Sequence, residues 1–98
     1  MQIIIRDEVK AFLSKKNSKV LTVSVIQSGG GWCGSLSIPE VGYRVPEVPE
    51  HYNIFHVDEI TVYVKKNVNT TADRLEFVVN KILFVKSLDI KGVKTMSH

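Results

Sequence analysis

The chain has 98 residues, of which 13 are Lys or Arg, 10 are Asp or Glu and one is Cys. This length favours a single domain over residues 1–98, and one cysteine excludes an internal disulfide and an all-cysteine zinc or iron–sulfur site within one chain. The sequence has no apolar run of about 18 residues, and it reaches Arg6 and Asp7 too early for a signal peptide. We therefore expect a cytoplasmic protein with no membrane span and no membrane partner.

The balance of aliphatic residues predicts a mainly β fold with some helix, a β-rich α+β class. The chain has 15 Val and 9 Ile against 6 Leu and 2 Ala. Side chains that branch at Cβ pack well on a pleated sheet, whereas Ala and Leu favour helices. The hydrophobic content of 44% is ordinary for a globular protein and excludes disorder over most of the chain.

The net charge of +3 is spread unevenly along the chain. Residues 1–20 carry +3, residues 21–63 carry −4 and residues 64–98 carry +4. The pairs Lys15-Lys16 and Lys65-Lys66 are short, and no basic stripe with interleaved aromatic residues is present. The pattern therefore does not favour binding to nucleic acid.

The N-terminal region predicts one strand and one helix. Residues 3–5, all Ile, are typical of a short strand, and residues 7–17 repeat apolar positions at helical spacing. The residues at this spacing are Val9, Phe12, Leu13 and Lys16, the last able to lay its stem on the apolar edge. Acidic residues begin the segment, lysines end it, and Asn17 is a suitable C-terminal stop. This helix is expected to cover one edge of a sheet.

Residues 19–27 predict a strong strand. Leu21, Val23 and Val25 fall on one face, and Val20, Thr22, Ser24 and Ile26 on the other. Because both faces are at least partly apolar, we expect a central strand. Residues 36–45 alternate more weakly, and Pro39 limits them to broken or edge pairing because proline cannot donate a ladder hydrogen bond.

The second half predicts two hairpins. Residues 46–51 form a loop by their prolines and charges, and residues 52–57 and 60–64 are strands joined at Asp58-Glu59. Residues 67–73 are polar and turn-rich, with a helical turn capped by Thr70 or Thr71 as one interpretation.

The C-terminal region predicts a second pair of strands. Residues 75–79 and 82–88 are expected to pair, joined at Asn80-Lys81. Residues 94–98 are expected to be a frayed tail, which leaves a folded core over about residues 3–92.

The segment over residues 28–34 is the candidate functional site. It follows the strongest strand and contains four of the six glycines, and its candidate cofactor-binding residues are Gly30, Gly31, Cys33 and Gly34. Glycines allow close backbone approach, and successive N–H groups can stabilise a thiolate. Cys33 is thus a candidate metal ligand or redox thiol. The alternative is that the glycines only turn the chain while Trp32 and Cys33 pack inward.

Three other interpretations of this segment fail. A phosphate-binding loop needs Gly-Lys-Ser/Thr, and a dinucleotide fingerprint needs a following helix, but Pro39 follows within a few residues. A cysteine hydrolase needs a histidine partner, and His51 and His56 are expected at the surface.

No general acid or base is assigned either. Glu40, Glu47 and Glu50 crowd one proline-rich stretch, where we expect them to be solvated. We therefore expect that the protein is not an enzyme.

The order of elements resembles the HesB/IscA-like domain of A-type iron–sulfur carriers. The matching stretches are the first strand and helix, residues 28–34, residues 54–64 and the late pair 75–79 and 83–86, and together they cover about residues 3–92. The chain is most similar to a branch of HesB-like proteins with a Cys-Cys or Cys-selenocysteine motif in this position.

This resemblance implies a pseudobarrel of short mixed strands with one N-terminal helix, often dimeric, with Cys33 as the one matching ligand. It implies iron or an iron–sulfur cluster shared across a homodimer, and iron–sulfur assembly or client proteins as partners. Trp32 stands where the branch has its second thiol or selenol, and the stretch Lys91-Gly92-Val93-Lys94 lacks the carriers' C-terminal Cys-Gly-Cys. The alternatives are a redox or thiol-sensing protein acting through Cys33 and a non-catalytic protein-interaction module.

Overall fold

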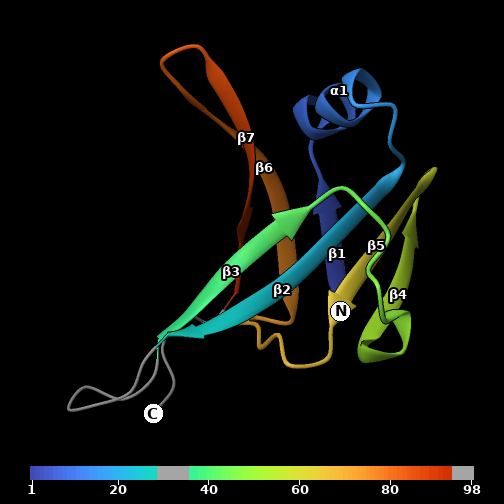
Figure 1. The fold of residues 1–98 in the computed structure, drawn as a ribbon, viewed down its shortest axis with the longest axis vertical. Coiled ribbons are helices and arrows are strands. Elements are labelled where there is room, and N and C mark those ends of the chain that lie inside the picture. The colour runs from blue at the N-terminus through green and yellow to red at the C-terminus, as the bar shows by residue number, and fades with distance from the viewer. Residues whose placement is uncertain (29–35, 94–98) are drawn as a thin grey trace.

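Two mixed β-sheets and one α-helix make up the part of the chain that the computed structural model describes, residues 1–28 and 36–93 (Figure 1). The elements in order are β1 (Gln2–Ile5), α1 (Asp7–Lys15), β2 (Val20–Ser28), β3 (Leu36–Gly42), the 3-10 turn η1 (Pro49–His51), β4 (Tyr52–Val57), β5 (Ile60–Lys65), β6 (Arg74–Ile82) and β7 (Val85–Lys91). The predicted β-rich α+β class is confirmed. No helix in these ranges is long and apolar enough to cross a membrane.

Each sheet combines one hairpin with a parallel neighbour. The larger sheet has the order β3-β2-β5-β4, in which β2 lies parallel to β5 and each of them forms an antiparallel hairpin with the outer strand. The smaller sheet has the order β1-β6-β7, with β1 parallel to β6 and β6 antiparallel to β7. The prediction of a central β2 is therefore confirmed, and of the two possibilities for the proline-containing β3, broken or edge pairing, the structure shows the edge position.

Helix α1 follows the predicted amphipathic pattern. Its acidic first turn and its C-terminal Lys15 suit the helix dipole, and Asn17, at φ 53°, turns the chain out of the helix. Val9 and Leu13 are buried, and the ammonium group of Lys16 lies 5.6 Å from the centre of the Phe12 ring. The helix is thus held by a narrow apolar face and by a lysine stem, as the spacing predicts.

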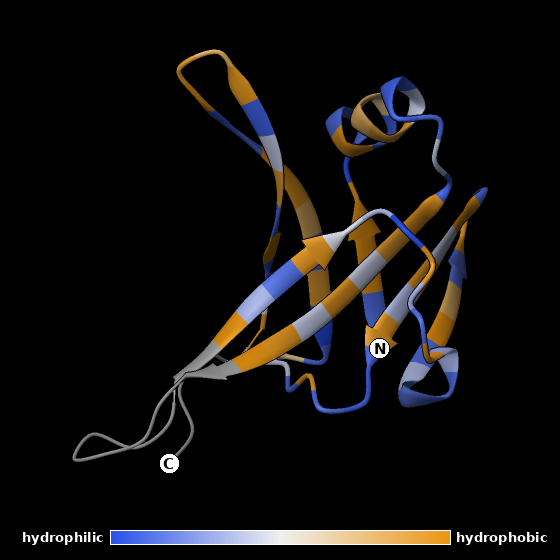
Figure 2. Cartoon of the chain, viewed as in Figure 1, coloured by the Kyte–Doolittle hydropathy of each residue, from blue (hydrophilic) through white to orange (hydrophobic). Residues whose placement is uncertain are grey.

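The core lies between the inner faces of the two sheets and is closed by α1. Leu21, Val23 and Val25 of β2 are buried, while the alternate positions are not, and Figure 2 shows this alternation as apolar and polar bands along the strand. The largest fully buried side chains are Phe77, Leu13, Leu21, Leu75, Val9, Val23, Val62 and Val64. These residues come from both sheets and from α1, so burying them requires the two sheets to assemble together.

The predicted turn between the last two strands is wrong. Asn80 and Lys81 continue β6, where they pair with Ser87 and Lys86 of β7, and the chain turns at Leu83 and Phe84 instead. The apolar run after Lys81 led to the prediction of a strand over residues 82–88. The hairpin extends past the core there, so the run forms its exposed tip.

The helical turn predicted within residues 67–73 is also absent from the structure. Val68 is buried, Thr70 forms a single bridge with Val93, and residues 71–73 bend into β6. The bridge closes the core at this end, since Val93 is also buried. A tertiary pairing therefore replaces the local capping that the threonines suggest. The predicted tail at residues 94–98 lies outside the described ranges.

Candidate functional site on the β2–β3 hairpin

The glycine-rich segment joins the paired ends of β2 and β3. Ser28, the last residue of β2, is opposite Leu36, the first residue of β3. The predicted cofactor-binding residues Gly30, Gly31, Cys33 and Gly34 fall between these ends, outside the described residues. Their roles, including that of Cys33 as a metal ligand, stay predictions.

The hairpin that leads to this segment extends beyond the core. Val25 of β2 is buried, whereas the next residue, Ile26, is 50% exposed. Its cross-strand partner Ile38 is 45% exposed. In Figure 1 this end of the hairpin lies far from α1. The strands therefore present an exposed apolar pair close in sequence to the segment that contains Cys33.

The two histidines considered as partners for Cys33 are exposed, as predicted. His56 of β4 is opposite Thr61 of β5, which is level with Val20 at the start of β2. Because a strand rises about 3.3 Å per residue, Val20 lies on the order of 26 Å from Ser28. His56 is thus at the end of the larger sheet opposite to the end where the cysteine segment begins.

A shallow polar hollow lies on the outer face of the larger sheet and includes His51. Two hydrogen bonds hold the segment after β3 against β2 and the residues just before it. The Thr22 hydroxyl donates to the Arg44 carbonyl, and the Ser18 hydroxyl donates to the Tyr43 carbonyl at 2.7 Å. The other polar residues that line the hollow include Ser24, Glu40, Glu47 and Lys65. Glu40, Glu47 and Glu50 are exposed, as predicted.

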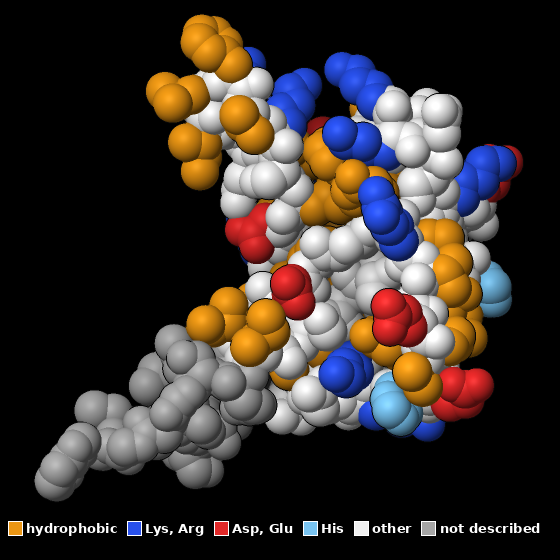
Figure 3. Space-filling model, in the orientation of Figure 1, with side chains coloured by type: hydrophobic (Ala, Val, Ile, Leu, Met, Phe, Trp, Pro, Cys, Tyr) orange, Lys and Arg blue, Asp and Glu red, His pale blue; other side chains and the backbone are white. Residues whose placement is uncertain are grey.

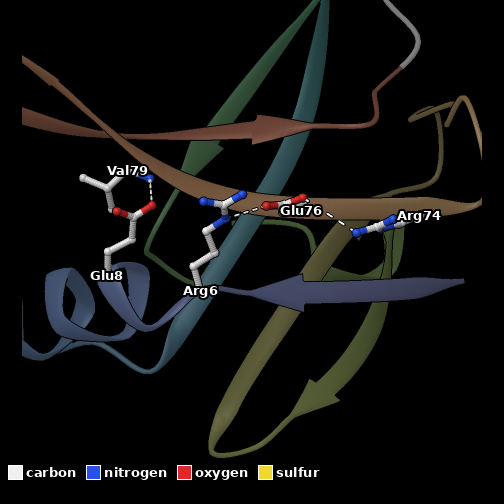
Figure 4. Close-up of polar contacts among 5 residues, drawn as sticks. All are labelled: Arg6, Glu8, Arg74, Glu76 and Val79. Carbon is white, nitrogen blue, oxygen red and sulfur yellow. Dashed lines mark hydrogen bonds and ion pairs between the residues drawn. The ribbon is translucent and has the colours of Figure 1, made fainter.

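The ion pairs with perturbed pKa values connect elements of the fold. The Arg6 guanidinium donates to Glu76 and lowers the pKa of that carboxyl, with Lys91 and Arg74 adding to the effect. Lys10 of α1 donates to Asp58 in the β4–β5 turn at 2.7 Å, and this bond raises the pKa of Lys10. In Figure 4 the guanidinium groups of Arg6 and Arg74 lie on either side of Glu76. These contacts attach β1 and α1 to their neighbours.

Within residues 1–28 and 36–93, no three side chains of His, Cys, Asp or Glu form a group that could hold a metal ion. The cysteine count supplies one thiolate per chain.

The fold and its cysteine segment define a small β-rich α+β protein with a glycine–cysteine connection between two paired strands. Residues 1–93 match the model of the CC/Se motif containing family, and the chain belongs to this family. Comparison with curated proteins and with solved structures gave no significant match.

One surface escaped prediction because its residues were assigned to a strand. Ile82, Leu83, Phe84 and Val85 are 70%, 85%, 96% and 68% exposed at the tip of the β6–β7 hairpin. Lys81 and Lys86 flank this run symmetrically, and their placement could have indicated a turn at its centre. With a turn there, the four apolar residues form the tip of a hairpin and not a buried strand.

Proposed function

We propose that the protein is a HesB-like, non-enzymatic thiol protein whose chemistry lies in the segment over residues 28–34. Cys33 is its metal ligand or redox thiol, and Gly30, Gly31 and Gly34 supply the backbone around the bound group. Membership of a family named for a CC/Se motif supports this proposal. The observation that carries it is the pairing of Ser28 with Leu36, which brings the two ends of the cysteine segment together at the end of a hairpin whose Ile26 and Ile38 are about half exposed.

The proposed bound group is iron or an iron–sulfur cluster shared by two copies of the chain. The exposed pair Ile26 and Ile38 favours such a contact, because burying it against a second copy would bring the two cysteine segments to one interface. Iron–sulfur assembly or client proteins are then the proposed partners, in the cytoplasm.

Anaerobic reconstitution with iron and sulfide tests this function. We expect the wild type to bind iron and to show cluster absorbance, and we expect Cys33→Ser to lose both. His56→Gln is the matched control, since His56 is exposed at the opposite end of the sheet. Absence of bound iron, or equal iron in wild type and Cys33→Ser, contradicts the carrier function.

The second candidate function is thiol sensing through Cys33. The rate of alkylation as a function of pH distinguishes it, because the thiolate is the nucleophile. Alkylation that persists at pH values well below about 8.5, the ordinary pKa of a cysteine thiol, supports sensing. A thiol that reacts only at higher pH, in a protein that also binds no iron, contradicts both thiol functions and leaves the interaction module.

A further inference from the structure

We propose that the tip of the β6–β7 hairpin, residues 81–86, docks the protein on an anionic membrane surface. Four consecutive apolar residues form the tip, and Phe84 at its centre is 96% exposed. An apolar cluster of this kind is rare on the surface of a monomer unless it meets a partner. Its neighbours in the structure indicate which partner it fits.

Lysines surround the apolar tip. Lys81 and Lys86 are directly opposite each other across the hairpin, immediately behind the Ile82 and Val85 pair. Two like charges in this arrangement destabilise a hairpin. An anionic surface would neutralise both ammonium groups at once, and binding to such a surface would account for the paired lysines.

Helix α1 adds further positive charge on the same side. Lys15 and Lys16 line a cleft together with Lys81, Lys86, Phe84 and Val85. Figure 3 shows the apolar tip and the neighbouring lysine and arginine side chains at one end of the molecule. Among residues 1–28 and 36–93 none of these four lysines forms an ion pair with a carboxylate. Their ammonium groups are therefore available to lipid phosphates.

The residue type at the tip is also unsuited to the turn, because a two-residue hairpin loop requires positive φ at its first position and favours Gly or Asn there. Leu83 has φ 56°, a conformation that side chains rarely adopt. Within residues 1–28 and 36–93, the other positions outside glycine with positive φ are Asn17, Asp58 and Asp73, residue types that tolerate it. A leucine here is a poor choice for the turn and a good choice for insertion into a lipid layer.

A lipid surface fits this tip better than a protein does. Lysine is depleted in protein–protein interfaces, which favour Tyr, Trp, Phe, Met and Arg, and of these only Phe84 occurs in residues 81–86. Lysine is well suited to the edge of a bilayer, where its stem lies along apolar groups while its ammonium reaches the headgroups. The expectation of no membrane partner rests on the lack of a spanning segment, and surface attachment needs none.

Flotation with vesicles tests the proposal. We expect wild-type protein to bind vesicles of equal parts phosphatidylcholine and phosphatidylglycerol, and to bind pure phosphatidylcholine far more weakly. Lys81→Gln/Lys86→Gln should weaken binding roughly 25-fold, at about fivefold for each lysine. Phe84→Ser should weaken it by roughly tenfold or more, because the insertion of the ring is lost.

Matched variants serve as controls. Lys65→Gln/Lys66→Gln removes the same charge at the end of β5, and Ile54→Ser removes a half-exposed apolar side chain from β4. Neither should change vesicle binding. The proposal is wrong if wild type does not bind the anionic vesicles, or if the controls lose as much binding as the tip variants.

Two further outcomes also overturn it. A dimer of the wild type that Phe84→Ser abolishes, without vesicle binding, identifies a second copy as the occupant of the tip. Likewise, capture of a protein by the tip without vesicle binding identifies a protein as the occupant.

Discussion

The Arg6 guanidinium, between β1 and α1, donates a hydrogen bond to the carboxylate of Glu76, the third residue of β6. Arg74 approaches the other carboxylate oxygen at 3.9 Å. Since β1 is an edge strand, this contact and the parallel ladder hold it in the smaller sheet.

The first prediction concerns the pH dependence of this contact. The hydrogen bond lowers the pKa of Glu76 below its ordinary value of 4.5. A carboxyl with a lowered pKa in the folded state contributes stability above its unfolded value, and this contribution disappears as the pH falls through the folded value. Glu76→Gln should therefore reduce the free energy of unfolding near neutral pH, and the difference from wild type should shrink by about pH 3.

Urea unfolding at the two pH values measures this difference. Glu59→Gln is the control, because Glu59 is 85% exposed and pairs with Lys19 only at 3.5 Å. Exposed pairs contribute about 0–1 kcal/mol, so the control should change little at either pH. A constant difference between Glu76→Gln and wild type across the range contradicts the prediction.

The second prediction compares two phenylalanines. Phe77 of β6 is fully buried between the sheets, whereas Phe84 is 96% exposed. Phe77→Ala should lower the free energy of unfolding by about 3–5 kcal/mol, because it removes buried apolar area and leaves a cavity. Phe84→Ala should stay within about 0.5 kcal/mol of wild type. Chemical denaturation measures both, and similar losses would show that the assignment of the core is wrong.

Local sequence patterns were sufficient to predict most of the larger sheet. The alternation at Leu21, Val23 and Val25 indicates the inner face of β2 because side chains alternate across a strand. Pro39 indicates the edge position of β3 because it lacks an N–H. Both signals act within one strand and need no knowledge of distant neighbours.

The C-terminal hairpin could not be predicted in the same way. Asn80-Lys81 has the composition of a turn, and Leu83-Phe84 has the composition of a strand, yet the structure reverses these roles. The register is fixed farther away, where Phe77 and Ile90 pair and are both buried. Once that pair is set, the turn must fall midway along the connecting chain.

The bridge between Thr70 and Val93 shows a similar limit of local patterns. The threonines of residues 67–73 favour helix capping only when a helix follows them, and here β6 follows instead. For the cysteine segment, the sequence predicts the candidate residues, and the structure describes the ends of β2 and β3 on either side of it.

The third prediction concerns Gly92, which follows β7. It has φ 99°, and a Cβ at this position would lie 2.2 Å from the Arg74 carbonyl oxygen. Gly92→Ala should destabilise the protein by about 2 kcal/mol or more, because the backbone conformation and the space both exclude a side chain. In Gly42→Ala a Cβ would meet nothing within 4 Å, and this variant should be neutral or stabilising by up to about 1 kcal/mol. Thermal and urea unfolding compare the two, and equal effects contradict the prediction.

The fourth prediction concerns Leu83, whose φ of 56° is unfavourable for a branched side chain. Leu83→Asn should stabilise the protein by about 0.5–1 kcal/mol, because asparagine tolerates this conformation and Leu83, at 85% exposed, loses little packing. Phe84→Asn is the control, since its position lacks the positive φ, and it should change stability by no more than about 0.5 kcal/mol. The free energies of unfolding from urea titration decide the matter. If Leu83→Asn is no more stable than Phe84→Asn, the turn does not carry the strain inferred from its backbone.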